Sequence, residues 1–488
     1  MLLPTLFKRC ALLPFLFSAA VALPAAEAPE PLAPLALDDC VQRALARNFA
    51  AEIGRFDTAN AAASVDLARA GFDPTLFASS TRAGSRAETA NSTYSGWSSR
   101  VGVSQHLVTG TDVSVTTSLD RTRNRYSGPY NPAYDSDVSL TISQPLLKGA
   151  GTTANRAALD QAKIGLDRSH LLYRGTMMDI VRDTEIAYYD LHFARRQLAV
   201  RKLSLAAAQR LLDENRIKRD TGVLTDLEVL TAEVGVATQQ RNVLLAEQQL
   251  RNSEDALRAL VGQFELEAPL GETEVAASTD FHPSIEETYS RAKQMQPEYL
   301  ALQKSIAQLE IELAATRRNR LPTLDLNTTL GYDTSNRDSA GDAFGDLPGS
   351  EGYNWQLGLE LAYPLGARGD RARLLQATNN LSRTRLQLRQ LEQNILVGAR
   401  NSVRAVSTSQ EAVRVAELAS ELSTRQYELE KARFDEGLST ARRVLDAQTD
   451  LDDARVAVLS SQVDLLSALA QLRRLEGRSL EGYTVAAP

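Results

Sequence analysis

The sequence predicts a protein that combines long α-helices with membrane β-strands in a duplicated helix, strand, strand, helix, helix unit. Three observations predict this fold class. A glycine turn followed by an apolar heptad occurs twice, and in both halves a proline precedes segments in which apolar and polar residues alternate. Two helical stretches of about 65 residues are also far longer than a globular domain requires.

The heptad segment after Gly222 recurs after Gly437, an offset of 437 − 222 = 215 positions. Both copies end in glycine, at Gly262 and Gly477. The matching apolar residues are Val229, Val236, Val243, Leu250 and Leu257 in the first copy and Val444, Leu451, Val458, Leu465 and Leu472 in the second. A match of this length, in register with a glycine at each end, indicates an internal duplication of a coiled-coil hairpin.

Length and composition exclude several classes of protein. The chain has 488 residues, of which 43% are hydrophobic and 24% charged, and its net charge of −7 argues against nucleic-acid binding. The four histidines, His106, His170, His192 and His282, lack metal-ligand spacing, and no phosphate-binding glycine loop is present. We therefore expect no enzyme activity, metal or cofactor, and we place His170 and His192 on solvated helix faces.

Residues 1–26 resemble a secretory signal peptide, with two basic residues before a short apolar run. Cleavage among the small residues 22–28 removes Cys10 and leaves Cys40 as the only cysteine of the exported chain. No later apolar run approaches the roughly 20 residues of a membrane-spanning helix. Any membrane-spanning part must then consist of β-strands, because only helices and closed barrels satisfy their backbone in lipid.

Two units follow, at 37–262 and 283–477, separated by a linker at 263–282. Each opens with a helix, predicted from residue 38 or 39 to 70 in the first unit and from Ser284 in the second. Glu287 lies three residues after Ser284, the pattern of a capping box. Each of these helices ends near a proline, and the two prolines are 322 − 74 = 248 positions apart.

Alternating segments after these prolines predict strands within 75–147 and 323–364. In the second unit, residues 324–332 and 355–363 each separate an apolar face from a polar face, with aromatic residues toward the ends. A soluble hairpin packed on a core is the alternative, but the signal peptide and the long flanking helices favour membrane strands. The first unit holds an additional pair, 97–108 and 112–119, which either joins the sheet or lies outside the membrane.

Very long helices come next, at 155–219 and 371–434, and each extends on the order of 100 Å. They reverse at the two glycine turns and return as the heptad helices. The predicted helical hairpins therefore span 153–262 and 370–477.

From residue 37 to 477 the chain resembles the TolC-like outer membrane efflux channels. The motifs that carry this resemblance are Pro-Thr-Leu after each opening helix, Gln-Pro-Leu and Tyr-Pro-Leu after the strands, and the two glycine tips. The resemblance implies a homotrimer with a transmembrane β-barrel in the outer membrane, continued by an α-helical coiled-coil barrel in the periplasm. The additional strand pair departs from the usual four strands per chain. One chain has too few strands to close an aqueous pore, so the strand number also favours a trimer.

The resemblance further implies a passive exit duct of a tripartite efflux system, with a periplasmic adaptor protein and an inner membrane transporter as partners. Two alternatives stay open. The same duct can serve type I protein secretion, and the chain can also be a periplasmic coiled-coil scaffold without a pore. The cargo cannot be read from the sequence.

Two groups of candidate site residues lie at the tips. The resemblance implies that the turns dock the adaptor, through Gly222, Val223, Leu224, Gly437, Leu438 and Ser439. It also implies an acidic entrance that attracts cations, formed by Asp226, Glu228 and Asp446. The alternatives are plain helix reversals and ordinary carboxylates at helix N-termini. Arg443, where the family often has an acidic residue, weakens such a ring.

Overall fold

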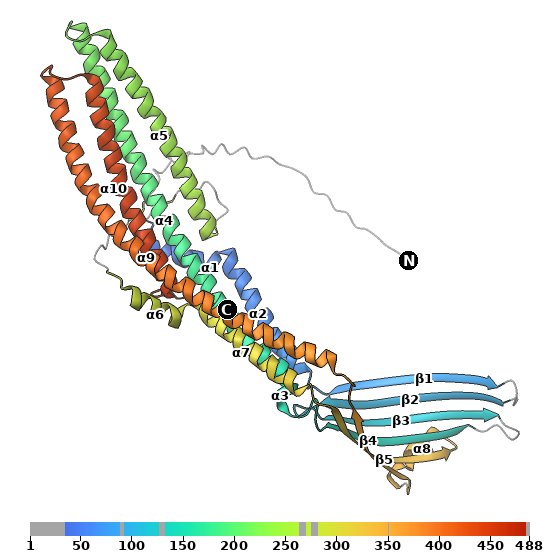
Figure 1. Cartoon of the computed structure of the whole chain (residues 1–488). Coiled ribbons are helices and arrows are strands. Elements are labelled where there is room, and N and C mark those ends of the chain that lie inside the picture. Colours follow the sequence, from blue (N-terminus) through green and yellow to red (C-terminus); the bar gives the residue numbers. More distant parts are fainter. Residues whose placement is uncertain are drawn as a thin grey trace, which may run out of the picture.

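The computed structural model describes residues 35–87, 92–125, 132–262, 270–274, 282–349 and 351–484. The chain is strongly elongated, with a β-sheet at one end, two helical hairpins at the other and shorter helices at a waist between them (Figure 1). The predicted signal peptide and most of the predicted linker lie outside the described residues. Long helices combined with an antiparallel sheet confirm the predicted fold class.

The two halves of the chain carry similar series of elements. In the first half these are α1 (Leu37–Arg47), α2 (Phe49–Ala70), β1 (Thr75–Ala87), β2 (Ser92–His106), β3 (Asp112–Arg125), β4 (Ala133–Pro145), α3 (Thr152–Asn155), α4 (Ala157–Asp220) and α5 (Asp226–Val261). In the second half they are α6 (Ile285–Met295), α7 (Pro297–Arg318), β5 (Thr323–Arg337), α8 (Ala340–Gly345), β6 (Tyr353–Ala362), α9 (Arg368–Asp435) and α10 (Ala441–Glu476). The strand pair β2–β3 and the short helices α3 and α8 interrupt this correspondence.

Each heptad seam packs against the long helix of its own hairpin. Val243 and Ala246 of α5 form a buried cluster with Leu198 of α4, and Leu465 of α10 forms one with Val406 of α9. Burying one such aliphatic side chain stabilises the fold by roughly 1.5–3 kcal/mol. The apolar period of seven residues thus holds together each of the two hairpins, α4–α5 and α9–α10.

Glycine is required where the returning helices end. Gly262 and Gly477 have φ values of +76° and +77°. A Cβ at Gly262 would lie 2.7 Å from the carbonyl oxygen of Arg47, and one at Gly477 would lie 2.7 Å from that of Met295. Since Arg47 and Met295 are the last residues of α1 and α6, each unit packs its opening helix against the end of its hairpin.

The predicted helix from residue 38 or 39 to 70 is two helices, α1 and α2, so the prediction of one continuous helix was wrong. Asn48 has an extended backbone, and its side chain accepts a hydrogen bond of 2.8 Å from the amide of Ala50. The same side chain donates to the carbonyl of Leu260 at 3.0 Å. Asparagine side chains compete in this way with helical hydrogen bonds. Gln296, at the matching position (296 − 48 = 248), separates α6 from α7.

The predicted capping box at the start of α6 is absent. The side chain of Ser284 makes no capping hydrogen bond. Glu287 instead accepts a hydrogen bond of 3.4 Å from Arg291, one turn later on the same helix. The helical ion pair therefore replaces the reciprocal cap.

All six strands form one antiparallel sheet in the order β1-β2-β3-β4-β5-β6. The additional pair, β2–β3, lies inside this sheet between β1 and β4, which settles the question that the sequence left open. Its strands are longer than predicted and pair over nearly their full length. The junction between the two halves is the pairing of β4 with β5.

The register gives the sheet one apolar and one polar face. One row across all six strands of the apolar face consists of Leu76, Val103, Val115, Leu140, Leu330 and Trp355. The adjacent row on the polar face consists of Thr75, Ser104, Ser114, Thr141, Thr329 and Gln356. Leu76 is 72% exposed and Trp355 67% exposed, so the apolar face has no cover over much of its area. Within the described residues, no helix combines the length and apolar character needed to cross a membrane.

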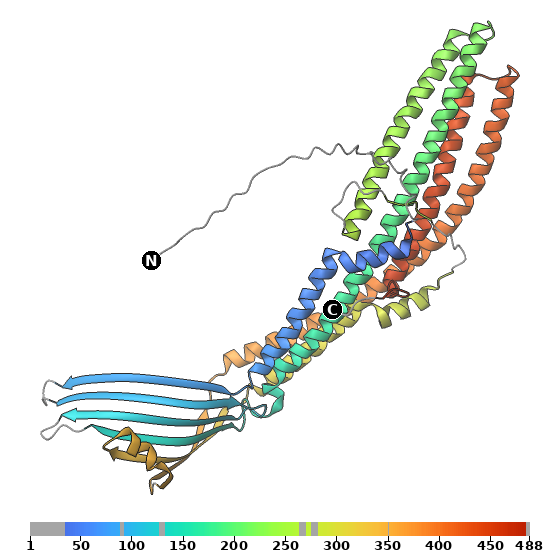
Figure 2. The same ribbon diagram turned by 180° about the vertical axis from the view of Figure 1, so that it is seen from behind.

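The waist is built around α4. Its side chains Met177, Met178, Tyr188 and Leu191 are completely or almost completely buried. Helices α1, α2, α5, α7 and α10 all contact α4, and the view from behind shows α2 lying along it (Figure 2). The hydroxyl of Tyr188 donates to the carbonyl of Leu35 at 2.7 Å, which ties the start of the described chain to this core.

Candidate functional sites at the helical tips and the waist

The two tips are closed by the same turn. Gly222 and Gly437 have φ values of +80° and +73°, in the left-handed region that favours glycine. In each turn, the amide after the glycine donates a hydrogen bond of 2.8 Å to the carbonyl five residues earlier, as in a Schellman motif. The duplication therefore extends to the backbone geometry of the tips.

The predicted docking residues differ in exposure. Val223 and Leu438 are 72% and 70% exposed and project from the two turns. Leu224 is half-buried against an apolar cluster, and Ser439 is half-buried with its hydroxyl donating to Glu430. Among the predicted docking residues, the freely accessible apolar side chains are thus Val223 and Leu438.

An apolar cluster joins the two tips. It consists of Leu211 from α4, Phe434 from α9, and Ala441 and Val444 from α10. The ammonium of Lys218 lies 4.7 Å from the ring centroid of Phe434, where a cation–π contact is favourable. The tips of the first and second hairpins therefore form one packed end of the molecule.

Glu228 of the predicted acidic entrance reaches across to the other hairpin. Its carboxylate accepts a hydrogen bond of 3.1 Å from the amide of Ala441, the first residue of α10. The side chain of the N-cap residue Thr440 makes no such bond. Glu228 therefore supplies the cap of α10, where the helix dipole favours a negative charge.

Asp226 and Asp446 remain at the surface, with side chains 93% and 70% exposed. Each lies near an arginine of its own hairpin. Asp226 is 3.8 Å from Arg219, and Asp446 is 3.9 Å from Arg442. The structure places these two carboxylates in solvent, so Glu228 is the one of the three predicted entrance residues that contacts the other hairpin.

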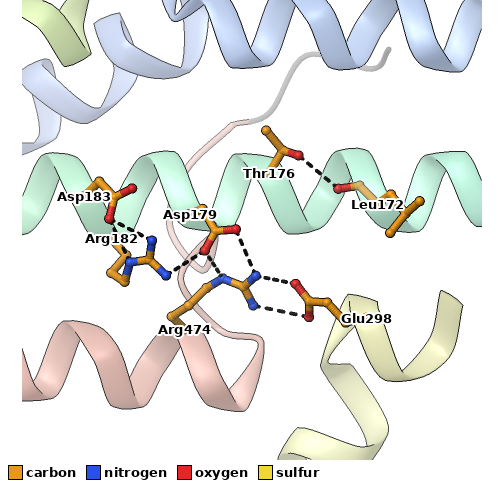
Figure 3. A network of polar contacts seen from close by, with 7 residues as sticks. All are labelled: Leu172, Thr176, Asp179, Arg182, Asp183, Glu298 and Arg474. Atoms are coloured by element: carbon orange, nitrogen blue, oxygen red, sulfur yellow. Dashed lines mark hydrogen bonds and ion pairs between the residues drawn. The ribbon is translucent and has the colours of Figure 1, made fainter. Parts of the chain in front are cut away.

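An ion-pair network centred on Arg474 lies at the waist and was not predicted (Figure 3). The guanidinium of Arg474 in α10 donates to Asp179 of α4 at 2.8 and 3.1 Å, and to Glu298 of α7. Arg182 also donates to Asp179, at 2.7 Å. The side chain of Arg474 is only 11% exposed. Because α4 belongs to the first unit and α7 and α10 to the second, this network fastens the two units together.

Arg474 stays protonated in this network. Burial by itself lowers the pKa of an arginine, but the hydrogen bonds to Asp179 and Glu298 raise the pKa of Arg474 by more. Its guanidinium has the planar geometry that binds two carboxylates at once, which a lysine cannot reproduce. The only sequence signal for this network is Asp179 itself, a charge within the buried run from Met177 to Val181.

A buried carboxylate, Glu185, lies beside this network. Glu185 of α4 is 2% exposed, and its carboxylate is 3.4 Å from the guanidinium of Arg473. Burial raises the pKa of Glu185, and the nearby charge of Asp38 adds to this effect while Arg473 opposes it. The waist therefore contains a carboxyl group whose ionised form is unfavourable in the folded protein.

The expectation that His170 and His192 lie on solvated faces was right for His170 and wrong for His192. His170 is exposed. Nδ1 of His192 lies 3.0 Å from the hydroxyl of Thr273, in the described segment 270–274 that follows α5. Burial lowers the pKa of His192 and favours the neutral imidazole. The pattern of α4 did not reveal this contact because its partner is 81 residues away.

Comparison with known sequences connects this architecture to a family. The model of the "Outer membrane efflux protein" family matches residues 110–263 and 288–478. The chain is 26% identical over 324 residues to the outer membrane protein TolC of Vibrio cholerae, covering 66% of this chain and 72% of that protein. It is 24% identical over 383 residues to the outer membrane efflux protein BepC of Brucella suis, covering 75% of this chain and 80% of that protein.

Solved structures share the fold. The CmeC outer membrane channel of Campylobacter jejuni aligns with a TM-score of 0.70 at 16% identity, covering 92% of this chain and 87% of that one. The outer membrane protein VceC of Vibrio cholerae aligns with a TM-score of 0.69 at 16% identity, covering 90% of this chain and 96% of that one. The family is one of channels and not of enzymes. This chain belongs to the outer membrane efflux protein family, as a TolC-like channel of the outer membrane whose helical part lies in the periplasm.

Proposed function

We propose that three copies of this chain form the passive exit duct of a tripartite efflux system. In this assembly the three sheets close one transmembrane barrel of 3 × 6 = 18 strands. The apolar faces contact lipid and the polar faces line the water-filled lumen. The helical hairpins continue the duct across the periplasm.

The observation that carries this proposal is a six-stranded sheet with two free edges and an exposed apolar face. Unpaired strand edges are not tolerated in lipid, and one sheet of six strands is too small to enclose an aqueous channel. Pairing β1 of one chain with β6 of the next satisfies both edges. The additional pair β2–β3 makes this barrel wider than one built from four strands per chain, because barrel diameter grows with strand number.

The resemblance to TolC-like channels supports a periplasmic adaptor and an inner membrane transporter as partners. The exposed side chains Val223 and Leu438 at the two tips offer the adaptor an apolar contact. The energy for export comes from the transporter. Glycines 222 and 437 shape the turns, and we assign Leu224 and Ser439 a supporting role in the same docking surface.

Channel activity and the acidic entrance are tested together by single-channel conductance in a planar bilayer. We compare the wild type with Asp226→Ala/Asp446→Ala and, as a matched control, with Asp213→Ala/Asp450→Ala, which removes two carboxylates of α4 and α10. A cation-selective conductance that falls only in the first variant supports both proposals. If the conductance of that variant is unchanged, the proposal of an acidic entrance is wrong. If the protein is soluble without detergent and never inserts into the bilayer, it is a periplasmic coiled-coil scaffold and not a channel.

Adaptor docking is tested separately with Val223→Asp/Leu438→Asp. We expect loss of efflux in cells while trimer formation and bilayer conductance stay as in the wild type, because a charge at the tip disrupts an apolar contact without altering the duct. Thr221→Asp/Thr440→Asp adds one carboxylate to each of the two turns without removing an apolar side chain and is the control. Full efflux by the Val223/Leu438 variant overturns the docking proposal.

A further inference from the structure

The outer part of the apolar sheet face carries a cluster of arginines. Arg82 of β1 and Arg121 of β3 flank Trp97 of β2 in one row, which ends at Tyr134 of β4. Arg123 follows two residues after Arg121 on the same face. We call Arg82, Arg121 and Arg123 the arginine cluster.

This cluster lies beyond the apolar band. The row through Val101 and Val138 is four residues closer to the helices than the row through Trp97 and Tyr134. Four residues of strand correspond to about 13 Å. Since β1 runs away from the helical part toward the far end of the sheet (Figure 1), the cluster lies at the outer side of the membrane, next to the outer leaflet. Aromatic side chains occupy such interfaces in barrels.

The acidic residues of the strands are confined to one face of the sheet. By register, the acidic residues of the strands all lie on the polar face, and they are Asp112, Asp120, Asp135, Asp137, Asp325, Asp333 and Glu360. Arg82 and Arg121 lie on the other face, and neither is within ion-pair distance of a carboxylate among the described residues. Arg337, at the end of β5, is paired with Asp346 at 2.8 Å. Arg82 and Arg121 therefore present positive charge to the lipid side of the sheet.

Local contacts hold Trp97 and Arg121 in place. The indole nitrogen of Trp97 donates to the hydroxyl of Ser80 at 2.7 Å, and the guanidinium carbon of Arg121 lies 5.5 Å from the ring centroid of Tyr134. Nε of Arg121 is buried without a hydrogen-bond partner. A pocket of about 420 Å³ is lined by the three arginines together with Ser95, Gly96 and Trp97. The unpaired donor of Arg121 beside this open pocket indicates a site for an anion.

We propose that the arginine cluster binds the phosphorylated headgroup of an anionic lipid in the outer leaflet, such as the lipid A part of lipopolysaccharide. Guanidinium groups bind phosphate through bidentate hydrogen bonds. The aromatic ring of Trp97 beside them contacts the sugar or the upper part of an acyl chain. The apolar band below receives the acyl chains. The lipid thus anchors the outer rim of the barrel at a fixed height.

The test uses the purified full-length protein in detergent, and native mass spectrometry counts bound lipid A carrying both phosphates. The variants are Arg82→Gln/Arg121→Gln and the control Arg100→Gln, which removes an arginine of β2 that lies on the polar face. We expect the double variant to bind lipid A at least about tenfold more weakly, and the control to differ by less than about twofold. Resistance of the trimer band to dissociation in gels verifies that each variant is folded.

Four further outcomes decide the proposal. Dephosphorylated lipid A should bind the wild type as weakly as the intact lipid binds the double variant. Equal loss in Arg100→Gln, or undiminished binding by the double variant, overturns the proposal. Displacement of lipid A by inorganic phosphate at equal concentration also overturns it, because the cluster then recognises a free anion and not a lipid headgroup.

Discussion

The carboxylate of Glu228 accepts a hydrogen bond of 3.1 Å from the amide of Ala441, so a side chain of the first hairpin caps the returning helix of the second. This contact is one of the few polar links between the hairpins at the tip end. It also shows that a residue resembling part of an acidic entrance has a structural task in the single chain. Substitutions of Glu228 should therefore affect the stability of the tip, whereas substitutions of the exposed Asp226 and Asp446 should not.

Glu228→Ala should loosen the tip of the second hairpin. Loss of an N-cap acceptor costs about 1 kcal/mol, and Glu228→Gln keeps an acceptor and should cost less. Hydrogen exchange of amides 441–444 is the measurement. We expect faster exchange there in Glu228→Ala with no change in the amides of the tip of α4. Exchange as slow as in the wild type would show that the cap contributes nothing.

Arg474→Met should destabilise the waist by about 2 kcal/mol, because Glu298 loses the guanidinium that it binds and Asp179 keeps only Arg182. Both carboxylates are more than a third exposed, which reduces the cost below that of a fully buried pair. The readout is the temperature at which the trimer dissociates. Arg414→Met, which removes an exposed arginine paired with Glu411, is the control and should leave that temperature unchanged.

Stability should depend on pH through Glu185. The pKa of this carboxyl is raised in the folded protein above its usual value of 4.5, mainly by burial. The folded protein then holds the proton more tightly than the unfolded chain, so the contribution to stability is complete below pH 4.5 and is lost as pH rises through the folded pKa.

Glu185→Gln should therefore dissociate at a higher temperature than the wild type near neutral pH, and at nearly the same temperature when the wild-type carboxyl is protonated. Glu421→Gln, at an exposed residue paired with Arg425, is the control. A variant that is less stable at neutral pH would mean that the ion pair with Arg473 outweighs the burial of Glu185.

Gly262→Ala should destabilise the protein more than Gly222→Ala, although both glycines have positive φ. The backbone strain of a left-handed alanine costs roughly 1–2 kcal/mol at either position. At Gly262 a Cβ would also meet the carbonyl oxygen of Arg47 at 2.7 Å, whereas nothing lies within 4 Å at Gly222. Trimer dissociation temperatures of the two variants give the comparison, and equal losses would contradict the contact with α1.

Cys40 should be inert in the folded protein. Its side chain is 2% exposed, and burial raises the pKa of its thiol to about 11, so the reactive thiolate is scarce at neutral pH. Maleimide should label Cys40 only after denaturation. Prompt labelling of the native protein would contradict its burial. An inert Cys40 also allows paired cysteines in β1 and β6 to test the proposed pairing between chains by disulfide formation.

Local sequence determined much of this protein. The heptads after Gly222 and Gly437, the prolines that precede the strands and the period-two alternation specified long hairpins, strand segments and an internal duplication. These features are readable because helices and strands impose a fixed period on the residues that they bury. The glycines of the tips were readable because a left-handed turn needs them.

Only the tertiary structure decided which elements meet. The position of β2–β3 inside the sheet depends on pairing with β1 and β4, and the alternation in these strands fits a sheet or a separate hairpin equally well. The ion pairs of Arg474 join residues 295 and 176 positions apart, and no local pattern encodes partners at that distance. The break at Asn48 arises in part from its bond to Leu260, 212 residues away. Sequence periodicity reports which face of an element is buried, whereas the partner that covers it is selected only when the whole chain packs.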